Sequence, residues 1–138
     1  MGLFTPKWKT NDRSKQIKAV EAVRKVTNEK ELRRIALEAP LPDVRMIAVY
    51  QMKNPAQLRE MAFSDDKYVS WAAIDNITDQ NTLKEIACGN VVHAGRAVEK
   101  ISNRNLLNEI VEKAVSQEAK DKAGTQLDFL NLLYEAVE

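Results

Sequence analysis

The chain has 138 residues, of which 44% are hydrophobic and 30% are charged, the composition of one folded domain rather than of a disordered segment. The formal net charge of +1 gives no overall attraction to polyanions, and the single cysteine excludes an intramolecular disulfide. Neither a signal peptide nor the ~20 consecutive apolar residues of a membrane span is visible, so a cytoplasmic protein is expected. With four Gly, four Pro and many helix formers, the sequence predicts an all-α fold.

The N-terminal segment is expected to be an irregular arm over residues 1–10, because no helical period is visible there. We expect its apolar residues Leu3, Phe4 and Trp8 to pack on the first helix. Residues 1–27 hold seven Lys and Arg against two acidic residues, a local charge of +5, which leaves −4 for the remainder. The candidate basic patch consists of Lys7, Lys9, Arg13, Lys15, Lys18 and Arg24.

Short amphipathic helices then follow one another along the chain. Six of them are expected at residues 12–26, 28–39, 43–52, 66–77, 90–101 and 117–137. Three more are expected between these, beginning at Asn54, Asp79 and Asn103. Residues whose side chains cap helix N-termini mark most of the starts: Asn28, Asp43, Asn54, Asp66, Asp79, Asn90, Asn103 and Ser116. Gly124 leaves open whether the last segment is one helix or two.

Equivalent residues recur every 24–26 positions. The columns include the caps Asn28, Asn54, Asp79 and Asn103, the alanines Ala22, Ala48, Ala73 and Ala97, and the leucines Leu32, Leu58, Leu83, Leu107 and Leu133. A two-helix unit of this length cannot bury its apolar face alone and must stack on its neighbours. The columns predict a right-handed α-solenoid in a single domain, 1–138, with four to five repeats over 11–115 and one or two C-terminal capping helices over 116–138. A compact helical bundle with accidental similarity is the alternative.

The segment 43–49, Asp-Val-Arg-Met-Ile-Ala-Val, followed by Met52, resembles the second helix of a HEAT repeat. It is most similar to the short HEAT-like units of small bacterial proteins and of the phycobilin-lyase-related group, and the resemblance covers roughly residues 11–127. It implies an armadillo-type α-solenoid. HEAT units often carry an Asp and an Arg that form a ladder along the stack, but here only Arg45 matches the Arg column, since the other units have Ala19, Ser70 and Ala94.

In HEAT-like stacks the second helix of each unit lines the concave face. In these helices, the columns two residues before and two residues after the alanines hold Met46, Tyr50 and Trp71, and Tyr68 lies nearby in the sequence. Large, adaptable apolar side chains of this kind are typical of binding hot spots. The alternative is that Met46 and Trp71 belong to the core between layers. The predicted function is therefore a non-catalytic scaffold that binds a peptide or protein on the concave face, with a monomer as the default state.

Three other functions compete with the scaffold. The basic patch could bind a nucleic-acid backbone, and the arm with Leu3, Phe4 and Trp8 could attach to a membrane surface. An enzyme such as a chromophore lyase has support from the resemblance alone. Packing explains the lone His93 and Cys88 best, so no catalytic, cofactor or metal site is expected.

Overall fold

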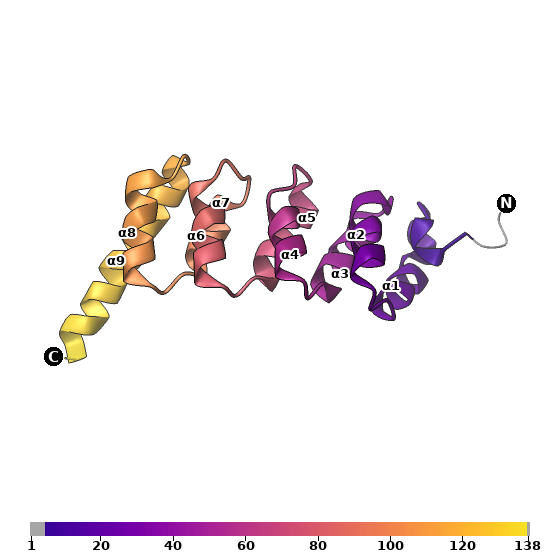
Figure 1. Cartoon of the computed structure of the whole chain (residues 1–138), viewed down its shortest axis with the longest axis horizontal. Coiled ribbons are helices and arrows are strands. Elements are labelled where there is room, and N and C mark those ends of the chain that lie inside the picture. The colour runs from indigo at the N-terminus through magenta and orange to yellow at the C-terminus, as the bar shows by residue number, and fades with distance from the viewer. Residues whose placement is uncertain (1–4, 138) are drawn as a thin grey trace. The chain divides into compact units, whose positions relative to one another are not determined.

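The computed structural model describes residues 5–137, and within them the chain is helical with no strand (Figure 1). This confirms the predicted all-α class. The chain divides into two compact units, Met1–Asn76 and Ile77–Glu138, which are taken one at a time.

The first unit alternates helices between two positions. Its elements are the 3₁₀ helices η2 (Lys7–Lys9) and η3 (Arg13–Lys15), then α1 (Gln16–Arg24), α2 (Glu29–Glu38), α3 (Pro42–Gln51), α4 (Pro55–Ala62) and α5 (Lys67–Asn76). Helices α1, α3 and α5 lie side by side, since α3 contacts both of the others. Helices α2 and α4 each pack against the helix that follows them, α3 and α5.

The second unit repeats this scheme. It contains α6 (Gln80–Cys88), α7 (Ala94–Glu99), α8 (Arg104–Lys113) and α9 (Gln117–Val137). Helix α6 pairs with α7 and α8 pairs with α9, while α7 also contacts α9 and α6 contacts α8. The end of α9 extends beyond α8 (Figure 1).

The predicted cap column is confirmed. Each cap side chain accepts a hydrogen bond from the backbone N–H three residues on: Asn28 from Glu31, Asn54 from Gln57, Asp79 from Thr82 and Asn103 from Leu106, at 2.9–3.1 Å. The first-turn N–H groups of a helix have no intrahelical partner, so each of these caps satisfies one of them. Asp66 does the same for α5, accepting from Tyr68 and Val69.

Two predicted caps are wrong. Asp43 does not cap α3, which begins one residue earlier at Pro42, because proline suits the first helical position; Asp43 accepts a hydrogen bond from Gln16 Nε2 at 2.6 Å instead. The helix expected over 90–101 begins only at Ala94, with His93 rather than Asn90 at its N-cap. The residues before it include Val91 and Val92, whose β-branched side chains disfavour a helical start.

Both ends of the chain refine the expectations. Helix α9 is one helix of 21 residues, so Gly124 does not divide it. At the other end, residues 7–9 form a 3₁₀ helix rather than an irregular arm. Trp8 is buried and η2 packs on α1, as expected for this residue, while Leu3 and Phe4 lie outside the described residues.

A second column, which the sequence analysis did not identify, connects successive repeats. Side chains near the ends of α3, α5 and α7, and in α9, donate to carbonyl oxygens of the preceding repeat: Gln51 to Arg24 (3.0 Å), Asn76 to Val49 (3.1 Å) and Met52 (2.9 Å), Lys100 to Ile77 (2.6 Å), and Gln126 to Ile101 (3.1 Å). Carbonyl groups at helix C-termini lack intrahelical donors, so this carbonyl ladder satisfies them.

Replacing Asn76 tests the carbonyl ladder. Asn76→Ala leaves the carbonyl groups of Val49 and Met52 without this donor, and we expect it to lower the free energy of unfolding by about 1–2 kcal/mol in urea titrations. Asn76→Gln is the matched control, because the same column holds Gln51 and Gln126, and it should lose less. Equal stability of Asn76→Ala and the unmodified protein would mean that water replaces the amide without cost.

Candidate functional site

The four predicted partner-binding residues lie on two adjacent helices of the first unit. Met46 and Tyr50 belong to α3, and Tyr68 and Trp71 belong to α5. Tyr50 and Tyr68 are each 40% exposed and Trp71 is 38% exposed, while Met46 is half-buried. The core interpretation of Trp71 is therefore wrong, and these residues form what we call the aromatic face.

A hydrogen bond joins the two helices on this face. Tyr50 Oη donates to Asp75 Oδ2 at 3.1 Å, and Asp75 lies one helical turn after Trp71. Tyr50 and Trp71 therefore point to the same side of the α3–α5 layer. Lys67 Nζ lies 5.3 Å from the centre of the Tyr68 ring, so the face carries both a positive and a negative charge at its border.

Small residues of α3 and α5 are fully buried in the helices that carry the aromatic face. Ala48, Ala72 and Ala73 have no exposed surface, and neither does Ser70, whose hydroxyl donates to the Ala62 carbonyl at 2.7 Å. Close packing limits the motion of the two helices that carry the exposed rings. The aromatic side chains are thus presented from a rigid base.

Arg45 fixes the start of α5. Its Nε donates to Asp66 Oδ2 at 2.8 Å, and its Nη1 donates to the Ala39 carbonyl at 2.8 Å. The other carboxylate oxygen of Asp66 caps the first turn of α5, which carries Tyr68. The sequence analysis assigned Asp66 a capping role, and its pairing with Arg45 is an addition. Arg45 of α3 thus connects the end of α2 and, through the Asp66 carboxylate, the helix that bears Trp71.

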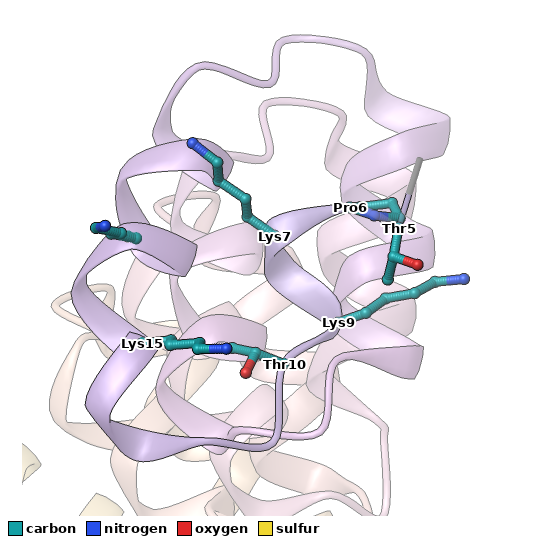
Figure 2. Close-up of a pocket in the computed structure, with 7 residues that line it drawn as sticks. Thr5, Pro6, Lys7, Lys9, Thr10 and Lys15 are labelled. Atoms are coloured by element: carbon teal, nitrogen blue, oxygen red, sulfur yellow. The ribbon is translucent and has the colours of Figure 1, made fainter. Parts of the chain in front are cut away.

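Four of the six basic-patch residues meet at one cavity. Lys7, Lys9, Lys15 and Lys18 line a cavity of about 370 Å³ together with Thr5, Pro6 and Thr10, without a carboxylate among these residues. Arg13 and Arg24 are exposed but do not line it. Figure 2 shows the side chains of Lys7 and Lys9 extending away from each other. The hydrocarbon stems of the lysines therefore border the cavity, and their charges are spread rather than focused on one point.

Trp8 is not available as a membrane anchor. It is 4% exposed, and the cations of Lys9 and Arg34 lie 5.5 and 5.6 Å from its ring. The other two residues expected in this role, Leu3 and Phe4, fall outside residues 5–137. Across those described residues, the helices are too short or too polar to cross a bilayer.

Cys88 and His93 are both half-buried in the second unit. Cys88 is half-buried, and burial raises the pKa of its thiol, which opposes formation of the reactive thiolate. His93 is half-buried at the start of α7. In the part of the chain that the structure describes, His, Cys, Asp and Glu side chains do not form a group of three that could hold a metal ion.

The sequence analysis also missed two ion pairs between repeats. Arg33 pairs with Glu60 at 2.7 Å in the first unit, and Lys84 pairs with Glu109 at 3.2 Å in the second. The basic residues both lie five positions after a cap, and the acidic ones six positions after the next cap. This regular spacing is the signal that could have identified them.

Comparison with known proteins adds no family to these observations. No family model, curated protein or solved structure matched the chain. The resemblance to HEAT repeats therefore rests on residues 43–52 and on the sequence columns.

Proposed function

We propose that the chain is a right-handed α-solenoid of short HEAT-like repeats that acts as a non-catalytic protein-interaction scaffold. The support for the solenoid is regularity at several levels. The cap column, the carbonyl ladder and the spaced ion pairs advance in step with the same period. Arg59 and Glu85 continue the two ion-pair columns in the sequence. A compact bundle has no reason to keep these columns in step.

Small-angle X-ray scattering tests the solenoid. A compact domain of this length has a radius of gyration of roughly 14 Å. A solenoid of stacked repeats should give a distinctly larger value and an asymmetric pair-distance distribution with a long tail, after extrapolation to infinite dilution. A symmetric distribution with a radius of gyration near the compact value would favour the bundle.

The aromatic face is the proposed binding surface, and the observation that carries this proposal is the joint exposure of Tyr50, Tyr68 and Trp71 on neighbouring helices. Aromatic anchors bury large apolar areas at low conformational cost, which is why tyrosine and tryptophan dominate binding hot spots. The tyrosine hydroxyls, Lys67 and Asp75 can orient a bound chain through polar contacts. A peptide or protein segment with apolar side chains and polar flanks fits this surface, which would be concave in the proposed solenoid.

Removing two anchors tests the aromatic face. We expect the double variant Tyr50→Ala/Trp71→Ala to bind a captured partner at least about 30-fold more weakly, the loss typical of a hot spot. Partners would be captured with the intact protein from its source cells and their affinity measured by titration with purified components. The far-ultraviolet circular dichroism should stay helical, because both side chains are substantially exposed.

Phe63→Ala is the matched control for the aromatic face. Phe63 is 39% exposed, close to Trp71, but lies at the end of α4 instead of on α3 or α5. This variant should retain binding. An unfolded double variant would identify Tyr50 and Trp71 as structural, and unchanged affinity in a folded one would remove the face from the binding site.

Binding of a nucleic-acid backbone is the second candidate, and the lysine-lined cavity is the observation that favours it. Such binding must weaken with salt, because each neutralised phosphate releases counterions. The triple variant Lys7→Ala/Lys15→Ala/Lys18→Ala should reduce the slope of log affinity against log salt by about 2–3. Fluorescence anisotropy with labelled oligonucleotides measures this slope, and Lys30→Ala/Lys53→Ala/Lys113→Ala is the charge-matched control. Affinity that does not change with salt would eliminate this candidate.

A further inference from the structure

The last half of α9 exposes a column that is buried in every earlier repeat. Leu32, Leu83 and Leu107 have no exposed surface and Leu58 has 6%, whereas the equivalent Leu133 is 47% exposed. Its neighbours are also exposed, with Phe129 at 59%, Leu132 at 64% and Val137 at 87%. Within residues 5–137 this is a concentration of exposed large apolar side chains on a single helix.

The exposure follows from a missing turn. In the earlier repeats a cap residue starts a new helix that packs against its successor, but Phe129 occupies the cap column here, and its side chain has no acceptor for a backbone N–H. Helix α9 therefore continues without a turn through a segment that would otherwise form a separate first helix.

The apolar residues of this segment form one stripe along α9. Phe129, Leu132, Leu133, Ala136 and Val137 have the spacing i, i+3, i+4, i+7 and i+8, which places them on one helical face. The side of α9 toward α8 is different: Arg104 Nη2 donates to Asn131 Oδ1 at 2.6 Å and stacks on the Tyr134 ring at 4.5 Å. The stripe is thus separate from the packed side, at the end of α9 that extends beyond α8 (Figure 1).

We infer that this stripe binds the same stripe of a second copy, in an antiparallel helix pair with two-fold symmetry. Reversing the direction of one helix places Phe129 opposite Ala136 and Leu132 opposite Leu133, and the two-fold axis generates the same contacts again. The largest side chain thus meets the smallest, and the leucines meet each other. This self-complementarity is what an isologous contact requires.

The size and charge of the stripe define the kind of dimer. Two copies bury on the order of 1,000 Å² in total, about the lower limit for a specific interface, so the dimer is weak and dissociates on dilution. Asp128 and Glu135 flank the stripe in both copies. Because these like charges repel across a two-fold contact, added salt strengthens the dimer. Pairing of these flanking carboxylates with the basic N-terminal region of another copy would weaken with salt instead.

Analytical ultracentrifugation over a wide range of protein concentration tests the inference. The mass should rise from 15.6 kDa toward twice that value. Leu132→Glu and Leu133→Glu should each raise the dissociation constant at least about tenfold, since every substitution acts twice in a two-fold dimer. Val92→Glu, which changes a 65% exposed valine that lies before α7 rather than on α9, is the matched control and should dimerise normally.

Cysteine cross-linking tests the direction of the helices. In a Cys88→Ser background, a mixture of Phe129→Cys and Ala136→Cys chains should form a disulfide between the two, whereas Ala136→Cys alone should not. Cross-linking of Ala136→Cys with itself would indicate parallel helices and overturn the antiparallel arrangement.

Three results would overturn the dimer itself. The first is a monomer at all concentrations, and the second is a dimer that both leucine variants leave unchanged. The third is a dimer lost in Ile17→Glu, since Ile17 is 75% exposed on α1 and its involvement would indicate head-to-tail association. The inference does not depend on the aromatic face, and Tyr50→Ala/Trp71→Ala should dimerise as the unmodified protein does.

Discussion

Every short helix leaves several backbone N–H groups at its start and several carbonyl groups at its end without intrahelical partners. Helices α1 to α8 have only six to ten residues each, so a large share of their backbone groups lies at helix ends. The cap column satisfies N–H groups locally, three residues from the cap. The carbonyl ladder satisfies carbonyl groups from the next repeat along the chain. Because the ladder works only when successive repeats lie in register, it couples local helix ends to the stacking that buries the apolar columns.

This division explains which features could be predicted from the sequence. Caps such as Asn54 and Asn103 act within one turn of helix, so residue type and position were sufficient to identify them. The donors Gln51 and Asn76 act on residues 24–27 positions away, and only the register of two helices brings them together. Asp43 was misassigned for a local reason, because Pro42 can itself begin a helix and makes a side-chain cap unnecessary.

The aromatic face shows the same limit at the candidate site. Trp71 shares its sequence column with Val20, Met46 and Gly95, and a column position alone does not determine exposure. Exposure follows from the packing of α5: Ala72 and Ala73 are on its buried side, whereas the Trp71 ring is 38% exposed. Arg45 adds a constraint that the other units lack at the same column, because it joins a cap, a helix end and α3 through one side chain.

At the end of α9, a residue of an otherwise buried column lies at the surface. Leu133 keeps its place in the leucine column, yet its surroundings differ because Phe129 cannot cap a new helix. One change in the cap column therefore converts a core position into a surface position without altering the leucine itself. The stripe consists of side chains typical of the core, although it lies at the surface. Burying it would therefore gain about 25 cal/mol for each Å² of apolar area. That gain is available to any surface of matching shape, and the stripe's own reversed copy has the required alternation of large and small side chains.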